Sequence, residues 1–155
     1  MRRTDREITD RAVIGAFLCA EQVMRVAFYD GGEIYIVPVN YGYAQENGAD
    51  CFYFHGAKAG RKYGLCLHTP KVGFEIDGEY RVITAETACA HSARFQSVIG
   101  TGTVTLLEDA AEKRRALGIL MQQTTGKSGW TFPAEQLDRT AVFRLTADKL
   151  SCKAK

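Results

Sequence analysis

Several features that would define a class of protein are scarce or absent in this sequence. Only 3 of its 155 residues are proline and only 1 is tryptophan. No apolar run approaches the roughly 20 residues that a membrane-spanning helix needs, so we expect no membrane segment. The charged stretch from Met1 to Arg11 lacks the apolar core of a secretory signal. Repeats, low-complexity tracts and linkers are missing too, which favours a single domain over residues 1–155.

Charge and cysteine content exclude further classes. The 20 basic and 18 acidic residues leave a formal net charge of +2, far from the basic excess of a typical nucleic-acid-binding protein. We therefore expect no nucleic-acid partner, and any anion site must be local. The 5 cysteines are odd in number and form no CxxC pair. This argues against a disulfide framework and favours a reducing, cytoplasmic compartment.

Hydrophobic periodicity predicts a mainly β protein. Strands are expected at 23–29, 33–43, 51–55, 71–76, 94–107 and 140–145, with turns at Asp30-Gly31-Gly32, Asn47-Gly48 and Asp77-Gly78. Helices are expected after a cap at Thr9 or Asp10, over 57–68 and after Asp109, where Asp109 and Glu112 resemble a capping box. This order of elements predicts a mostly antiparallel β-barrel with peripheral helices.

The sharpest local pattern is HGAKAGRK at residues 55–62, where a predicted strand gives way to a predicted helix. No acidic residue occurs between Asp50 and Glu75, and Lys58, Arg61 and Lys62 have the spacing of one helix face. Cations at a helix N-terminus are unfavourable without a nearby anion, because the helix dipole is already positive there. The pattern predicts a phosphate site. The alternatives are a solvated basic face or cations that pair with distant acids.

Two strands carry further candidate ligand contacts. Pro38 cannot donate a ladder hydrogen bond, so we expect it at a sheet edge or an interruption, where backbone groups from Val37 to Asn40 are free for a ligand. An ordinary edge proline is the alternative. In the long strand, Gly100 and Gly102 share a face and predict a barrel bend or close backbone approach. Ser97 beside them is either a ligand contact or an ordinary surface serine.

These segments, in this order, resemble the nitroimidazole-reductase-like branch of the pyridoxamine 5'-phosphate oxidase-related family of FMN-binding split barrels. They are RRxDREI at 2–8, VPVNYGY at 37–43, YFHGAxxGRK at 53–62, FEID at 74–77, AC at 88–89 and SVIGxG at 97–102. The resemblance covers nearly the whole chain and is strongest from Glu33 to Asp77.

The resemblance implies a homodimeric, FMN-binding split β-barrel with FMN between the subunits. It implies that Arg61 and Lys62 hold the FMN phosphate, and the local charge pattern adds Lys58 as a further cofactor-binding candidate. It further implies flavin contacts from Val37, Pro38, Val39, Asn40, His55 and Gly56, and contacts from Ser97, Val98 and Trp130 of the same or the partner subunit. We hypothesise that NAD(P)H reduces the flavin and that a nitro-aromatic or quinone-like small molecule accepts the electrons.

His55 is the candidate proton donor or substrate clamp, because the ordinary histidine pKa lies near neutrality, and packing at a strand end is its alternative role. Two Cys-x-His pairs, Cys66/His68 and Cys89/His91, offer too few ligands at too unusual a spacing to predict a metal site. Two alternative functions stay open. One is a non-catalytic flavin-binding or redox-sensing module, and the other is a haem-binding split barrel with a histidine axial ligand.

Overall fold

An antiparallel sheet dominates the computed structural model, which describes residues 4–155; Arg2 and Arg3 of the N-terminal motif lie outside the described residues. The strand order is β3-β2-β6-β7-β8-β5-β4, with β1 paired to β8. The strands are β1 Glu7–Ile8, β2 Val23–Asp30, β3 Glu33–Asn40, β4 Gly42–Glu46, β5 Ala49–Ala57, β6 Lys71–Ile83, β7 Ser92–Leu107 and β8 Thr140–Ala154. The helices are α1 Arg11–Ala20, α2 Arg61–His68, α3 Ala110–Thr125 and α4 Ala134–Arg139.

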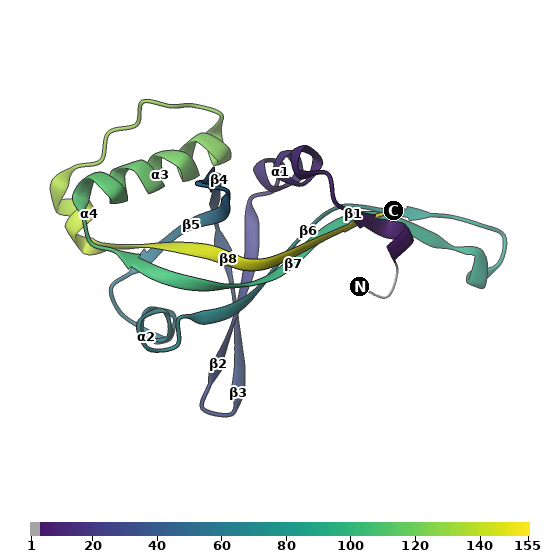
Figure 1. Cartoon of the computed structure of the whole chain (residues 1–155), viewed down its shortest axis with the longest axis horizontal. Helices are drawn as coiled ribbons and strands as arrows, with labels where there is room; N and C mark the ends of the chain where they lie inside the picture. The colour runs from purple at the N-terminus through teal and green to yellow at the C-terminus, as the bar shows by residue number, and fades with distance from the viewer. Residues whose placement is uncertain (1–3) are drawn as a thin grey trace.

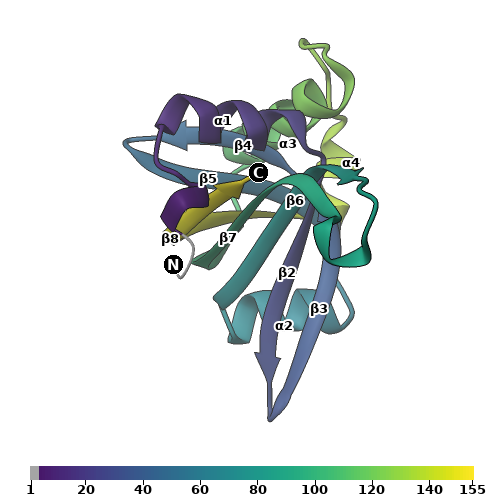
Figure 2. The same ribbon diagram turned by 90° about the vertical axis from the view of Figure 1, so that its right-hand side faces the viewer.

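The predicted architecture of a split β-barrel with peripheral helices is confirmed (Figure 1). In that view α1, α3 and α4 lie above the sheet and α2 lies below it. The β2–β3 hairpin points away from the three upper helices. The far end of the β6–β7 hairpin, residues 79–94 and here called the arm, extends away from the barrel in Figure 1 and points toward the viewer in Figure 2.

The core explains why β5 is apolar on both faces. Successive strand residues point to opposite sides of a sheet. Phe52 and Phe54 therefore enter the barrel core, whereas Cys51 and Tyr53 pack in a second cluster with α3 and α4. Because β5 is covered on both sides, it leads into the segment at 55–62 as a rigid strand.

Close backbone approach at the two glycines of β7 is confirmed. A Cβ atom on Gly102 would lie 2.5 Å from the carbonyl oxygen of Thr146, and one on Gly100 would overlap that of Lys149. The β7–β8 register shifts between Thr101 and Gly102. The glycines thus let two long strands bend past each other as the barrel curves.

Several predicted boundaries are wrong, for identifiable reasons. The predicted strand 33–43 is divided at Tyr41, whose buried hydroxyl donates to the Leu18 carbonyl at 2.7 Å. Asp77-Gly78 does not end β6, which continues through a register shift into the arm. The helix predicted over 57–68 begins only at Arg61, because β5 continues to Ala57 and Gly60 has a left-handed φ of 88°.

Candidate functional site

The start of α2 brings three predicted residues together. The Lys62 ammonium donates to the His55 carbonyl at 3.0 Å. A Cβ atom on residue 56 would lie 2.7 Å from the Lys62 Nζ atom, so glycine leaves the space that the ammonium occupies. His55, Gly56 and Lys62 therefore form one corner, here called the α2 corner, where β5 ends and α2 begins.

Backbone amides add to the positive potential of this corner. Gly60 is the N-cap of α2, and no side chain caps the helix. The first helical bond runs from Gly64 to the Gly60 carbonyl at 3.1 Å, so the preceding amides of the first turn lack an intrahelical acceptor. Free amides and a lysine at a helix N-terminus are a donor set that suits phosphate. The residues at this corner therefore fit the phosphate end of a flavin nucleotide.

Arg61 has acidic partners that the sequence around it does not contain. Its guanidinium donates to Asp30 at 2.8 Å and to Glu33 at 3.1 Å, and it lies 4.7 Å from the ring centre of Tyr35. Both carboxylates come from the β2–β3 turn. They hold Arg61 beside α2, and a phosphate would share the guanidinium with them.

The predicted placement of Lys58 is wrong. Lys58 is exposed and precedes α2, so it does not share a helix face with Arg61 and Lys62. It lies near Lys113 of α3, whose pKa is lowered first by burial and then by the Lys58 charge. Lys58 therefore contributes positive charge to the surroundings of the site without belonging to the helix.

The outer edge of β3 supplies free backbone groups, as predicted, but not through a break in pairing. The β2–β3 register is continuous from Val23↔Asn40 to Asp30↔Glu33, and β3 is a terminal strand of the sheet. Tyr41 donates to the Gln22 carbonyl, so these two residues form a hydrogen-bonded pair, and such pairs alternate with non-hydrogen-bonded ones along antiparallel strands. Pro38 and Asn40 fall in the non-hydrogen-bonded pairs, so their backbone groups point to the open edge of the sheet.

Val37 and Val39 differ from their neighbours on β3. Their backbone groups fall in the hydrogen-bonded pairs with β2, and their side chains pack against the barrel core. The predicted flavin contacts are therefore corrected for these two residues. Only Pro38 and Asn40 of the four offer backbone groups to a ligand.

The prediction for the β7 strand is also corrected in part. Val98 has 0% exposure, and its strand is paired on one side with β6 and on the other with β8. It therefore has no atom available to a cofactor. Ser97 lies on the outer face of the sheet between Asp77 and Lys153, where a partner subunit or ligand could reach it.

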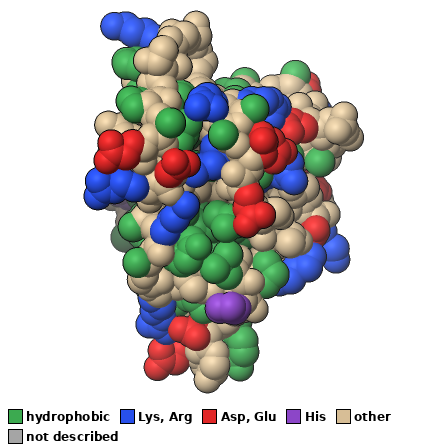
Figure 3. Space-filling view, turned by 90° about the vertical axis from the view of Figure 1, so that its left-hand side faces the viewer, with side chains coloured by type: hydrophobic (Ala, Val, Ile, Leu, Met, Phe, Trp, Pro, Cys, Tyr) green, Lys and Arg blue, Asp and Glu red, His purple; other side chains and the backbone are tan. Residues whose placement is uncertain are grey.

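His55 borders a cavity of about 190 Å³ between β5, α3 and α4. Met121, Phe132, Gln136 and Thr140 are among the residues that line it. Figure 3 shows this side of the molecule, the left of Figure 1, with hydrophobic side chains gathered near its centre and both basic and acidic ones around them. The cavity combines an imidazole, an amide and a hydroxyl with apolar walls, which suits a small aromatic molecule.

The imidazole of His55 is held in its neutral form near pH 7. Part of the side chain is exposed, yet the atoms packed around it lower its pKa by desolvation, and the Lys62 charge lowers the pKa further. A neutral ring both donates and accepts a hydrogen bond. This favours the role of a substrate clamp over that of a cationic acid.

A pH dependence of stability follows from this shift. The unfolded chain binds the His55 proton more readily than the folded chain, so the stabilising contribution is present above the ordinary pKa of about 6.5 and is lost as the pH falls below it. We expect the free energy of unfolding, measured with urea at several pH values, to fall less steeply with acidity in His55→Gln. Identical pH profiles for the two proteins would contradict the shifted pKa.

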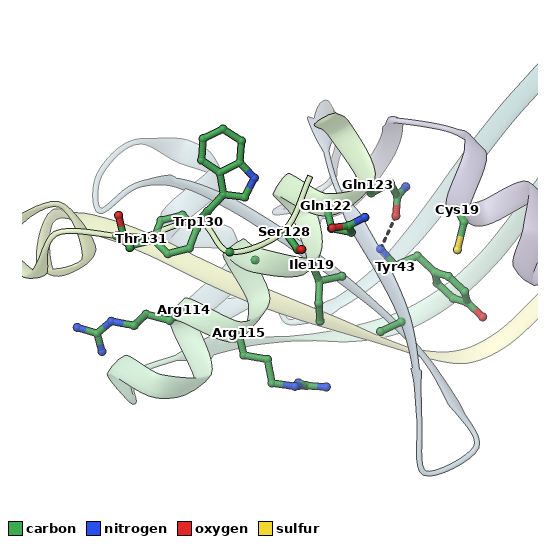
Figure 4. Close-up of a pocket in the computed structure, with 14 residues that line it drawn as sticks. Cys19, Tyr43, Arg114, Arg115, Ile119, Gln122, Gln123, Ser128, Trp130 and Thr131 are labelled. Atoms are coloured by element: carbon green, nitrogen blue, oxygen red, sulfur yellow. Dashed lines mark hydrogen bonds between the residues drawn. The ribbon is translucent and has the colours of Figure 1, made fainter. Parts of the chain in front are cut away.

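Trp130 lies in a different and larger cavity, a groove of about 850 Å³ between α3, α1, β4 and the loop at 126–133. Trp130 is 44% exposed, and its indole donates to the Lys127 carbonyl at 3.0 Å. In Figure 4 it stands on this loop, away from the side chains of Arg114 and Arg115. The residues that line this groove include Trp130 but not His55, Gly56 or Lys62, although Phe132 lines both the groove and the His55 cavity.

The cysteines divide into two groups. Cys51, Cys66 and Cys152 are buried, whereas Cys19 and Cys89 are exposed. Burial raises the pKa of the Cys66 thiol to about 12, so it is an inert apolar residue. Over residues 4–155 no three His, Cys, Asp or Glu side chains cluster as metal ligands would. In the same range no helix has the length and apolar character to cross a membrane.

Comparison with known proteins identifies the family. The model of the pyridoxamine 5'-phosphate oxidase family matches residues 10–154, so the chain belongs to that family. No curated protein matches the sequence. Among solved structures, a proposed 5-nitroimidazole antibiotic resistance protein from Bacteroides thetaiotaomicron is 27% identical with a TM-score of 0.82, over 96% of this chain and 86% of that one.

Two further structures share the fold at lower identity. The flavocytochrome Anf3 from Azotobacter vinelandii is 23% identical with a TM-score of 0.80, over 100% of this chain and 72% of that one. A FAD- and haem-binding protein from Mycobacterium smegmatis is 18% identical with a TM-score of 0.79, over 97% and 73% of the two chains. The family resemblance predicted from the ordered motifs is thus confirmed.

Proposed function

We propose that this protein is an FMN-dependent oxidoreductase that passes electrons from NAD(P)H to a small nitro-aromatic or quinone-like acceptor. The α2 corner carries this proposal, because uncapped amides, Lys62 and Arg61 lie together at the end of β5. The proposed 5-nitroimidazole resistance protein among the similar structures supports the class of acceptor.

The chain's own residues would divide the work as follows. Lys62 and the α2 amides bind the phosphate, and Arg61 adds a second positive charge beside it. The free backbone groups of Pro38 and Asn40 are suited to the alternating donors and acceptors of a flavin ring. The bound flavin would supply the electron transfer, while His55 and its cavity would hold the acceptor by a hydrogen bond.

We further propose that the active unit is a homodimer. The outer face of the sheet exposes four large apolar side chains on β2, β3 and β7: Tyr29 at 61%, Ile34 at 64%, Ile36 at 60% and Ile99 at 57%. One row of paired residues crosses this face: Ile36 on β3, Ala27 on β2, Gly73 on β6 and Thr101 on β7. Because Ala27 and Gly73 in the middle of the row are small, the face is low in relief there. Extensive exposed apolar surface marks an interaction site. A second subunit on this face would also be a source for the Trp130 contact that the α2 corner lacks.

The visible spectrum of the purified protein tests the proposal. We expect an oxidised flavin spectrum, release of FMN on denaturation, anaerobic bleaching by NADH or NADPH, and return of the colour when a 5-nitroimidazole is added. A flavin that neither nicotinamide reduces would favour the binding or sensing module. A Soret band instead would favour a haem protein, and a colourless chain that does not bind added FMN would refute the proposed FMN-dependent function.

A further inference from the structure

The arm is a two-stranded ribbon that exposes apolar side chains without covering them. Tyr80 is 72% exposed, Val82 50% and Ile83 46%. Tyr80 and Val82, two residues apart, share one face of the ribbon and Ile83 lies on the other, so both faces carry apolar surface. An isolated two-stranded ribbon is at best marginally stable in water. The arm therefore needs a surface to pack against that its own barrel does not provide.

The arm also carries an uncompensated pair of positive charges. Arg81 and Arg94 are directly opposite each other across β6 and β7. Like charges at such cross-strand positions are destabilising. Among the described residues neither arginine forms an ion pair, and both border a surface hollow with Glu79 and Tyr80. Two unpaired guanidinium groups side by side indicate an acidic surface on a binding partner.

The base of the arm has the opposite charge. Arg25 forms ion pairs with Glu75, at 2.9 Å, and with Asp77. The Glu21 carboxylate lies against Gly78, where its pKa is raised by desolvation and by the charges of Asp77 and Glu79. Arg25 thus pairs with two carboxylates, while those of Glu21 and Glu79 lie near Asp77 with no arginine partner among the described residues, so the surface at the base of the arm has excess negative charge.

This arrangement is self-complementary. A cationic segment and an anionic segment follow each other along one ribbon, so two copies related by a twofold axis would place each beside its opposite. Exposed apolar side chains gather on the same strands. Eight of the eleven exposed large hydrophobic residues lie on β3, β2, β6 and β7: Val23, Tyr29, Ile34, Ile36, Tyr80, Val82, Ile83 and Ile99.

We propose that the arm docks on a second copy of this chain, with Tyr80 and Val82 against the outer sheet face of the partner subunit and Arg81 and Arg94 beside the partner's Asp77. The inference rests on the proposed dimer and adds the segment that clamps it. Each arm would gain the packing and the counter-charge that it lacks within its own chain.

Removal of the apolar contacts is the first test. Tyr80→Asp with Val82→Asp should weaken dimerisation at least tenfold in sedimentation equilibrium, because both side chains are exposed within the chain and their charge would enter the interface. Val13→Asp, at an exposed apolar position on α1, is the matched control and should leave the dimer unchanged. Far-ultraviolet circular dichroism would verify that each variant is folded. A monomeric wild type, or a double variant that dimerises like the wild type, would overturn the proposal.

A charge-swap experiment tests the orientation. Chains with Arg81→Glu and Arg94→Glu, and chains with Asp77→Lys, should each dimerise poorly, because like charges would meet in both homodimers. An equimolar mixture should recover a heterodimer, since both of its contacts pair opposite charges. Failure of the mixture to recover would contradict the proposed contact.

Flavin absorbance on the same samples separates this inference from the proposed function. Dimers that stay colourless after FMN is added and that the arm variants dissociate would support the clamp and refute the FMN-dependent function. A yellow monomer would support the flavoprotein and overturn the clamp.

Discussion

Replacing both Arg61 and Lys62 with alanine is expected to weaken FMN binding about 100-fold or more. Each residue would donate a charge-assisted hydrogen bond to the phosphate, and such bonds contribute about 1.5–3 kcal/mol each. Loss of both removes about 3 kcal/mol or more, and each 1.4 kcal/mol is a factor of about ten in affinity. Titration of the flavin-free protein with FMN, followed by quenching of flavin fluorescence, measures the effect.

A matched control separates a specific site from general charge. Lys71→Ala with Arg139→Ala removes the same two charges from exposed side chains that form surface ion pairs with Asp148 and Glu135. This control should bind FMN like the wild type. Because the Arg61 ion pairs are exposed, their loss should cost little stability. Unchanged FMN retention in the Arg61 and Lys62 double variant would remove the α2 corner from the proposed site.

Replacing Phe52 with alanine should lower the free energy of unfolding by about 3–5 kcal/mol. Phe52 has 0% exposure, and its ring centre lies 5.0 Å from that of Phe74, 5.5 Å from Tyr43 and 5.6 Å from Tyr41. Alanine would leave a cavity among three rings that join β4, β5 and β6, and tightly packed strands cannot close it without moving.

Urea denaturation monitored by circular dichroism would measure this loss. Phe52→Leu keeps most of the apolar volume and should lose clearly less stability, which separates the cavity from the loss of ring contacts. A decrease below about 1 kcal/mol for Phe52→Ala would mean that the surrounding strands rearrange to fill the space.

Local signals in the sequence were sufficient for the elements whose ends depend on neighbouring residues. Asp10 caps α1 by accepting from the Ala12 amide at 2.8 Å, and Asp109 caps α3 by accepting from the Ala111 amide at 2.9 Å. The β2–β3 turn uses left-handed conformations at Gly31 and Gly32, as the glycine pair predicted. In each case the interacting residues are two or three positions apart, so a short stretch of sequence is enough to predict the interaction.

Elements that depend on distant partners could not be predicted in this way. The strand predicted to end at Leu145 continues as β8 to Ala154, because β7 pairs with it along that length. The segment from Thr146 includes Asp148 and Lys149 and lacks a clean apolar alternation. Its strand conformation therefore comes from the neighbouring strand and not from its own composition.

The same limit applies to the site. His55, Gly56 and Lys62 lie within eight residues of one another, and the structure brings them together. The acids that hold Arg61 come from 31 and 28 residues earlier in the chain. Because the sequence around Arg61 contains no carboxylate, the local pattern wrongly suggested that its charge is unpaired. Burial of Val98 likewise depends on which face of β7 enters the barrel, and a short motif does not contain that information.

The division of the cysteines has a practical consequence for spectroscopy. Of the five thiols only Cys19, in the α3 groove, and Cys89, on the arm, are exposed. A thiol-reactive dye would therefore attach at two informative places without any engineered substitution. Replacing one of the two with serine would leave a single reporter, and energy transfer between dyes on Cys89 of separate chains would follow subunit association in real time.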